Sequence, residues 1–220
     1  MPAREHHLRV SRTARYYTLG DAAAARQVWF VLHGYGQLAA YFIRHFAPLD
    51  DGSRLIVAPE GLSRFYLERT TWRSAGEARV AASWMTREDR DHEIADYVSY
   101  LDQVYQRVMA ERTRDQAHVV VLGFSQAVAT ACRWVGKGSA RADTLVMWAG
   151  PLPPDLDAAA TQRLLALKVI RVLGDQDDMA APDVVVAEEA SLRELGISAE
   201  LVRFRGGHEL DAGVLKSLPV

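Results

Sequence analysis

Five short apolar runs recur along the chain, separated by longer polar or amphipathic stretches. They lie at residues 28–32, 55–58, 119–122, 145–148 and 169–173. Each run is almost continuously apolar, which is typical of strands whose two faces are both covered. A sixth run, at residues 199–204, alternates apolar and polar positions and predicts a strand nearer the edge of the sheet.

A helical period is clearest at residues 91–109, where apolar side chains recur at i, i+3, i+4 and i+7. These positions are Ile94, Tyr97, Val98, Leu101, Val104, Tyr105 and Val108. One face of this helix is therefore expected to be buried. Apolar strands that alternate with such helical stretches predict an α/β fold with a mostly parallel central sheet and helices on both faces.

Two segments do not fit this alternation. Residues 7–10 and 14–18 predict an antiparallel hairpin that leads into the parallel strands. Residues 59–90 show no sustained period and form a connection far longer than the usual length of about four to six residues. We expect them to form a functional loop on the substrate side of a single domain that spans residues 1–220.

The charge balance narrows the function classes. The chain has 26 Lys and Arg residues against 28 Asp and Glu residues, a formal net charge of -2. Such a chain has no general field to hold nucleic acid or an anionic membrane, so a local pocket for a small molecule is expected to carry the function.

The single cysteine and the lack of long apolar stretches indicate in which cellular compartment the protein is expected. Cys132 cannot form an internal disulfide and is expected to be a packing residue. No segment resembles a secretory signal or an apolar span of about 20 residues, so we expect no integral membrane association and a cytoplasmic setting. The oligomeric state stays open, with a homodimer as one option.

A candidate nucleophile follows the run at 119–122 directly. Residues 123–127 read Gly-Phe-Ser-Gln-Ala and precede a helical stretch. A strand, a sharp turn and a helix form the context of a nucleophile elbow, which lifts the hydroxyl of Ser125 clear of the sheet. Gly123 provides the small first residue that the elbow needs, whereas Ala127 adds a methyl group where the usual pattern ends in glycine. An ordinary strand-to-helix turn is the alternative.

A serine nucleophile needs a base, and the base needs an orienting acid. The run at 169–173 ends in Gly-Asp-Gln-Asp-Asp at residues 174–178, at the tip of a predicted parallel strand. These aspartates fit a triad acid, a solvated loop or a cation site. His208 follows the last strand between two glycines and Glu209. A lone histidine is more often structural, but this position downstream of an elbow and an acidic loop favours a catalytic base.

The oxyanion of acyl transfer needs backbone donors. Residues 33–36, His-Gly-Tyr-Gly, follow the run at 28–32 directly. In an elbow-type site one N–H comes from this loop and one from the residue after the nucleophile, so we predict Tyr35 and Gln126 as donors. A plain glycine turn is the alternative, and His33 is expected to hold the loop rather than to act as a second base.

Taken together, these four segments resemble the phospholipase/carboxylesterase family, which includes acyl-protein thioesterases and small bacterial carboxylesterases. The resemblance spans residues from about 27 to the C-terminus, and Gly-Phe-Ser-Gln at 123–126 is its most specific motif. It implies the α/β-hydrolase fold and the cleavage of carboxylic esters by a triad of Ser125, Asp177 and His208. In the family pattern the acid is the fourth residue of the Gly-x-x-Asp segment, which selects Asp177. Residues 58–67 and 83–85 are similar to a bacterial subgroup of esterases, which implies activity without naming a substrate.

The triad chemistry requires neither a cofactor nor a metal ion. Acyl thioesterase and lysophospholipase activities use the same machinery and remain alternatives. A ligand-binding scaffold whose elbow no longer works is a further alternative, as is a metal-dependent hydrolase that uses the aspartates of residues 174–178.

Residues expected to contact the substrate come from the 59–90 segment, which is unusually apolar for a loop. We predict that a pocket above Ser125 is walled by Leu62, Phe65, Trp72, Trp84 and Met85. The equal alternative is that these side chains only pin the long loop to the body. Arg73, beside Trp72, is the candidate for contact with a substrate carboxylate.

Overall fold

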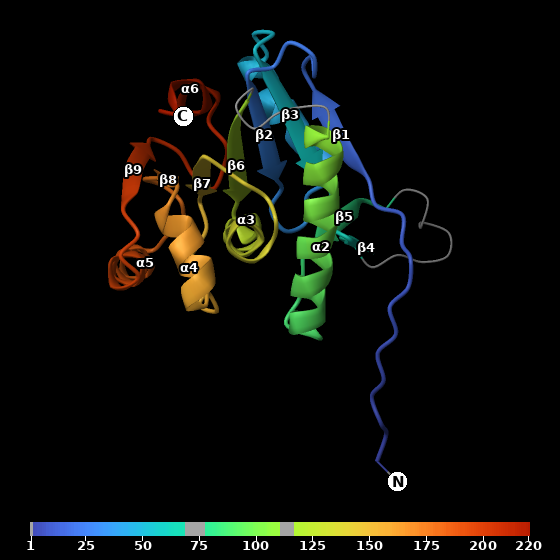
Figure 1. Cartoon of the computed structure of the whole chain (residues 1–220). Coiled ribbons are helices and arrows are strands. Elements are labelled where there is room, and N and C mark those ends of the chain that lie inside the picture. The colour runs from blue at the N-terminus through green and yellow to red at the C-terminus, as the bar shows by residue number, and fades with distance from the viewer. Residues whose placement is uncertain (1, 69–77, 111–116) are drawn as a thin grey trace.

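The computed structural model describes residues 2–68, 78–110 and 117–220. Within these residues a seven-stranded sheet runs through the centre in the order β1-β3-β2-β6-β7-β8-β9 (Figure 1). Its strands are β1 (Tyr16–Leu19), β2 (Gln27–Leu32), β3 (Arg54–Pro59), β6 (His118–Phe124), β7 (Thr144–Trp148), β8 (Lys168–Gly174) and β9 (Ala199–Phe204). β1 is antiparallel to β3 and all other pairs are parallel, so the six predicted strands and the mostly parallel sheet are confirmed. β9 lies at one edge, as its alternating pattern predicted.

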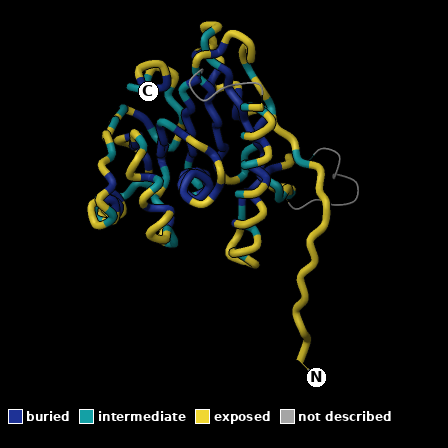
Figure 2. The backbone as a smooth tube through the Cα atoms, in the orientation of Figure 1, coloured by how far each residue is buried: buried dark blue, intermediate teal, exposed yellow. Residues whose placement is uncertain are grey.

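Helices cover both faces of the sheet, each over its own apolar core. One face carries α2 (Arg90–Met109), α3 (Gln126–Lys137), α4 (Ala158–Leu165) and α5 (Pro182–Glu194). The other carries α1 (Ala39–Phe42), the 3-10 helix η1 (Ile43–Leu49) and α6 (Ala212–Ser217). Figure 2 shows the buried strands between helices whose outer sides are exposed. The strands are therefore covered on both faces, which explains their continuous apolar runs.

The predicted helix at 91–109 is α2, and it begins one residue earlier than predicted. Ile94, Tyr97, Leu101 and Val104 are buried in the core, as the helical period predicted.

The predicted N-terminal hairpin is wrong. Residues 7–10 form no strand, and this part of the chain trails away from the body (Figure 1). Only Tyr16–Leu19 forms a strand, and it pairs with β3, Tyr16 opposite Pro59, rather than with an N-terminal partner. The reason is burial: β3 offers an edge beside an apolar core, whereas Leu8 and Val10 are 87% and 77% exposed and have no apolar face to cover.

The prediction that residues 59–90 form one long loop is wrong in part. Its described residues contain an antiparallel pair, β4 (Ser63–Tyr66) and β5 (Val80–Ser83), with Ser63 opposite Ser83 and Tyr66 opposite Val80. The sequences of these strands, Ser-Arg-Phe-Tyr and Val-Ala-Ala-Ser, do not alternate strictly between polar and apolar residues, so no strand period could be read from them. Residues 69–77, which include Trp72 and Arg73, lie outside the described residues.

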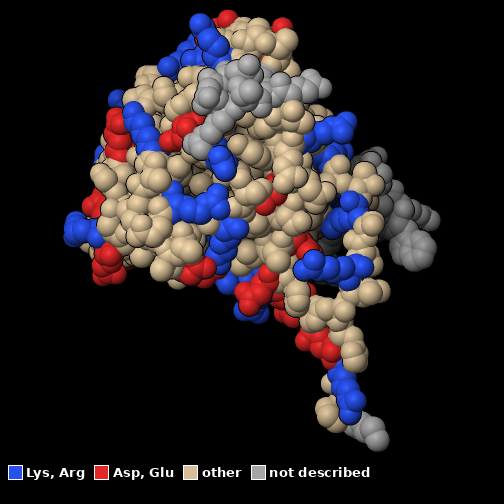
Figure 3. Space-filling view, viewed as in Figure 1, with Lys and Arg blue, Asp and Glu red and all other residues tan. Residues whose placement is uncertain are grey.

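Charged side chains are interspersed on the face seen in Figure 3, where neither sign forms a broad field. This agrees with the near-zero net charge. Among the described helices, none combines the length and the apolarity needed to cross a membrane.

Candidate active site

Ser125 lies at the sharp turn between β6 and α3, with φ 55° and ψ −119°. A non-glycine residue at positive φ is strained, and this one is held in place because its N–H donates to the Trp148 carbonyl at 2.8 Å. The strand and helix approach each other closely here, since a Cβ at Gly123 would lie 2.2 Å from the Ala127 carbonyl oxygen. The elbow therefore requires glycine at 123. The methyl group of Ala127 is fully buried in the core, so the turn accommodates alanine at this position.

A second small residue supports the elbow, and sequence reasoning missed it. Gly150 follows β7, and a Cβ there would lie 2.2 Å from the Ser125 carbonyl oxygen. The preceding Ala149 has φ 52°, another sign of a tight turn. An Ala-Gly pair directly after an apolar run was the sequence signal that could have identified it.

The three predicted triad residues meet at the carboxyl ends of the strands. The Nε2 atom of His208 lies 2.8 Å from the Ser125 hydroxyl, and its Nδ1 atom lies 2.8 Å from a carboxylate oxygen of Asp177. The second carboxylate oxygen of Asp177 accepts the Met179 N–H at 2.8 Å. This pattern assigns the proton of His208 to Nδ1 and leaves Nε2 free to accept from the serine. The Asp177 side chain is 1% exposed, whereas that of His208 is 28% exposed.

The other aspartates of the acidic loop have different surroundings. Asp175 accepts the Gly206 N–H at 3.1 Å, and the Gln176 N–H donates to the Gly206 carbonyl at 2.9 Å. Asp178 is exposed. The acidic loop is thus bonded to the histidine loop at a point that is independent of the Asp177–His208 pair.

Two aromatic side chains set the position of His208. Phe124 packs against its ring with the centroids 5.1 Å apart. The Trp148 indole N–H donates to the carbonyl of Glu209, the next residue along the loop, at 2.8 Å. The imidazole is therefore placed by packing and by its backbone as well as by its two hydrogen bonds.

The predicted oxyanion loop follows β2 and is held by Gln37 and β5. The Gly34 N–H donates to the side chain of Gln37 at 2.8 Å, and the Gly36 N–H donates to the Ala82 carbonyl at 3.0 Å. The backbone N–H groups of Tyr35 and Gln126 donate to no acceptor in the described part of the chain. Gln126 is the first residue of α3, where a helix has no internal acceptor for its N–H. Both predicted donors are therefore available to a ligand.

His33 has the structural role expected from the sequence. It is fully buried, its Nε2 accepts the Gly61 N–H at 3.0 Å, and its Nδ1–H donates to the Gly34 carbonyl at 2.8 Å. Burial lowers the pKa of His33, although the hydrogen bond to Gly34 and the charge of Glu60 oppose this. The imidazole is thus neutral and joins the oxyanion loop to the chain after β3.

The side chain of Gln126 makes contacts that the sequence did not reveal. Its amide N–H groups donate to the Met85 carbonyl at 2.9 Å and to the Ser83 hydroxyl at 3.1 Å, and its oxygen accepts the Trp84 N–H at 3.3 Å. We call residues 83–85 the hairpin exit. Gln126 fastens this segment to the first turn of α3.

The predicted substrate-contact residues have different positions. Trp84 is 1% exposed, packs in the core and donates its indole N–H to the His33 carbonyl at 2.7 Å, so its assignment to a pocket wall is wrong. It pins the segment to the body instead. Leu62 and Met85 are half-buried against the same core, and their contact with a substrate stays a prediction. Phe65 is half-buried with its ring 5.2 Å from that of Tyr35, beside the oxyanion loop.

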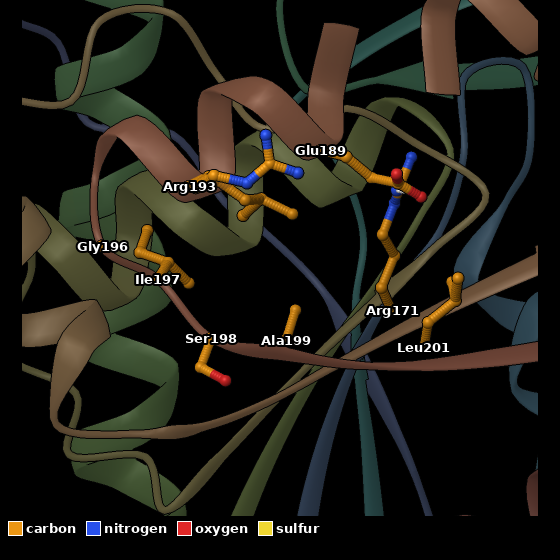
Figure 4. A pocket seen from close by; sticks show the side chains of 9 residues that line it. Arg171, Glu189, Arg193, Gly196, Ile197, Ser198, Ala199 and Leu201 are labelled. Carbon is orange, nitrogen blue, oxygen red and sulfur yellow. Dashed lines mark ion pairs between the residues drawn. The ribbon is translucent and has the colours of Figure 1, made fainter. Parts of the chain in front are cut away.

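Two hollows lie toward the β9 side of the molecule. One, of about 450 Å³, lies between α5 and β9, where Arg171 stands beside Glu189 (Figure 4). The other, of about 560 Å³, is lined in part by residues 174–178. Neither is lined by Ser125 or His208, so neither is assigned as the substrate pocket.

The chain matches no protein-family model, and no curated protein matches it in sequence. Solved structures do resemble it. A carboxylesterase from Mesorhizobium loti is 16% identical, with 92% of each chain covered and a TM-score of 0.69. Acyl-protein thioesterase 2 from Zea mays is 15% identical, with 94% of this chain and 96% of that chain covered and a TM-score of 0.68. Esterase PE8 is 20% identical over the same shares, with a TM-score of 0.61.

The likeness extends over more than nine-tenths of these chains, and with the observed sheet it establishes the α/β-hydrolase fold. At sequence identities of 15–20%, the comparison shows a shared fold and no more.

Proposed function

We propose that this protein is a serine hydrolase that cleaves carboxylic esters through an acyl-enzyme intermediate. The observation that carries the proposal is the unbroken hydrogen-bonded path from the Ser125 hydroxyl through His208 to Asp177, with both links at 2.8 Å. A path of this kind lets the imidazole take the hydroxyl proton as the serine attacks, while the carboxylate stabilises the imidazolium.

The reaction proceeds in two halves. Ser125 Oγ bonds to the ester carbonyl carbon as its proton moves to His208 Nε2, and the Tyr35 and Gln126 N–H groups bind the oxyanion. Collapse breaks the bond to the alcohol, which leaves with the proton from His208. A water molecule then attacks the acyl carbon as it gives a proton to His208. Collapse breaks the bond from Ser125 Oγ to the acyl carbon, which releases the acid, and His208 returns the proton to Oγ.

The similar structures support this reaction class, because they are named as a carboxylesterase, an esterase and an acyl-protein thioesterase. The thioesterase likeness favours acyl thioester cleavage as a second candidate function, with the same residues in the same roles. Lysophospholipase activity would use the same machinery.

The decisive experiment measures the hydrolysis of p-nitrophenyl esters of increasing chain length. Ser125→Ala should lower kcat by at least about 10³-fold, because the nucleophile is gone while the fold is unchanged. A fluorophosphonate should label Ser125 in the wild type. Ser139→Ala, at an exposed serine outside the site, is the matched control and should keep full activity and labelling.

The competing readings give different results in the same assay. Tight ester binding without turnover would favour the ligand-binding scaffold. Activity that disappears in excess chelator would favour a metal-dependent hydrolase. Comparing each acyl ester with its thioester of the same chain length separates esterase from thioesterase activity.

We also propose that the protein works in the cytoplasm. Cys132 is the single cysteine of the chain, so the protein has no internal disulfide, and this fits a reducing compartment. A homodimer remains one option for the oligomeric state, which sedimentation would determine.

A further inference from the structure

A second group of ligand-type side chains lies outside the proposed catalytic machinery, where the N-terminal segment passes the start of α2. It consists of His7, Asp89 and His92, with Glu5 beside His7, and we call it the tail–helix cluster. One donor atom from each of the first three lies within 4.8 Å of the others. The cluster brings together two segments that are far apart along the chain.

The spacing of these atoms suits one metal ion. His7 Nε2 lies 3.3 Å from Asp89 Oδ1 and 3.4 Å from Glu5 Oε1. Neighbouring ligands on a tetrahedral Zn²⁺ are about 3.3 Å apart, because each lies about 2.0–2.2 Å from the ion. His92 Nδ1 is closer to Asp89, at 2.6 Å, and a small rotation of the exposed carboxylate would open that distance. The two imidazole rings are stacked with their centroids 4.1 Å apart, so one of these exposed rings must turn for both nitrogens to reach the same ion.

The ligand types narrow the choice of ion. Imidazole nitrogens with carboxylate oxygens suit Zn²⁺ and similar transition metals, whereas Ca²⁺ and Mg²⁺ prefer sites made only of oxygen ligands. Two histidines and up to two carboxylates match a four-coordinate zinc site.

Half of the cluster is fixed by the helix itself. Asp89 and His92 are three residues apart across the first turn of α2, on the same side of the helix. The Glu93 N–H donates to the Asp89 carbonyl at 3.1 Å, which sets the backbone at this point. A ligand pair on a rigid helix end loses little freedom when it binds an ion.

The other ligands, His7 and Glu5, lie on the N-terminal segment, which makes few other contacts with the body of the protein. Leu8 and Val10 project into solvent, and the exposed ion pairs of His7 with Glu5 and Asp89 contribute little in water. A bound metal ion would attach the N-terminal segment to the start of α2.

We propose that the tail–helix cluster binds one Zn²⁺ ion, with His7, Asp89 and His92 as ligands and Glu5 as the fourth candidate. The ion joins the N-terminal segment to the start of α2. This proposal is independent of ester hydrolysis, and its tests do not use activity.

Calorimetric titration of the tag-free, metal-free protein with ZnCl₂ tests the site. The wild type should take up one equivalent. His7→Ala and His92→Ala should each weaken binding by at least about tenfold, since even the loss of a residue that only orients a ligand costs about that much. His6→Ala, the neighbouring histidine, is the matched control and should bind as the wild type does, and titration with MgCl₂ should give no binding. The proposal is overturned if the wild type takes up no zinc. It is also overturned if the His7→Ala, His92→Ala double variant takes up zinc as the wild type does, or if His6→Ala loses zinc binding and His7→Ala does not.

Limited trypsin digestion gives a second readout that reports on the attachment. Arg4, Arg9 and Arg12 flank His7 in the exposed segment. Zn²⁺ should slow cleavage after these residues in the wild type but not in His92→Ala, because the substitution removes the helix half of the site. Equal cleavage rates of the wild type with and without Zn²⁺ contradict the attachment.

Discussion

At the scale of single residues, the strained backbone of Ser125 depends on small neighbours. Its conformation costs about 1–3 kcal/mol and persists only where the surroundings impose it. Gly123 and Gly150 allow this, because a Cβ at either would overlap the elbow backbone. Ala127 has a different role, since its methyl group points into the core rather than at the turn.

The substitution Ala127→Gly tests this distinction. It restores the usual elbow pattern, yet it removes a buried methyl group and places glycine in a helix. We expect the free energy of unfolding to fall by about 1–2 kcal/mol while kcat is unchanged. Urea unfolding and ester assays measure the two quantities. A large gain in kcat would mean that the alanine restrains the nucleophile.

The acidic loop permits an equally direct comparison. Asp177→Asn should lower kcat by about 10³- to 10⁴-fold, because the amide oxygen stays on the Met179 N–H, the NH₂ group then donates to Nδ1, and the imidazole takes the wrong tautomer. Asp178→Asn makes the same chemical change at the next residue, which is exposed, and should keep full activity. Similar losses in both variants would point to the charge of the loop rather than to one hydrogen bond.

At the scale of elements, the site is assembled from a helix, a loop and a hairpin that brace one another. Gln126 contributes a backbone N–H that has no acceptor among the described residues and a side chain that fastens the hairpin exit to α3. β5 in turn bonds to the oxyanion loop through Gly36 and Gln37. The small sheet of β4 and β5 is therefore part of the framework that holds both predicted oxyanion donors.

Gln126→Ala separates the two contributions of this residue, since the backbone N–H remains. The Met85 carbonyl and the Trp84 N–H each lose a partner, so we expect the free energy of unfolding to fall by about 1–3 kcal/mol. We also expect kcat to fall by about tenfold, because the donors are less firmly placed. Gln103→Ala, on the outer side of α2, is the control. Unchanged stability and kcat in Gln126→Ala would show that the side chain does not brace the site.

His33 links the oxyanion loop to Gly61 by hydrogen bonds, and its burial should make the stability of the fold depend on pH. In the unfolded chain its pKa is the ordinary 6.5, whereas burial lowers the pKa in the fold. The unfolded state therefore binds more protons below pH 6.5. Stability is fully present above that pH and is lost as the pH falls toward the folded pKa, with a slope of up to about 1.4 kcal/mol per pH unit. Urea unfolding between pH 8 and pH 5 measures this loss. His33→Gln should flatten the slope in that range, and an equal slope in the variant would contradict the assignment.

The parts of this arrangement that could be predicted from the sequence are those with a local signal. Continuous apolar runs predicted the strands of the main sheet, and the long period of α2 predicted that helix. Ser125, the acidic loop at 174–178 and His208 were read from motifs beside strand ends, the family resemblance selected Asp177, and the structure brings all three side chains together. β4 and β5 were missed because their residues do not alternate between polar and apolar. The contacts of Gln126 and the burial of Trp84 depend on long-range packing, which leaves no mark on neighbouring positions.

At the scale of the whole molecule, β1 is the edge strand on one side of the main sheet and covers the edge of β3. β1 pairs with β3, and just before it Arg15 bonds to Glu60, whose carboxylate is fully buried. Burial by itself would raise the pKa of Glu60, but hydrogen bonds from Arg15 and Arg64 and their charges lower it. The residues before Arg15 add few contacts of this kind.

Two truncations test whether the stabilising contacts of the N-terminal segment begin near Arg15. Removal of residues 2–13 should change the free energy of unfolding by less than about 0.5 kcal/mol, because these side chains are almost all exposed. Removal of residues 2–19 should cost about 2 kcal/mol or more, since it deletes β1 and leaves Glu60 with one arginine. Equal stability of the two truncated proteins, measured by urea unfolding, would mean that β1 does not protect the sheet.

The hydrogen bonds from Gly206 to Asp175 and from Gln176 to Gly206 tie the loop of His208 to the loop of Asp177, away from Ser125. In the proposed acyl-enzyme, Ser125 has no hydroxyl left to bond to the imidazole. We therefore expect the bonds between the two loops to keep His208 oriented until water arrives, so that the second half of the proposed reaction needs no rearrangement of the base.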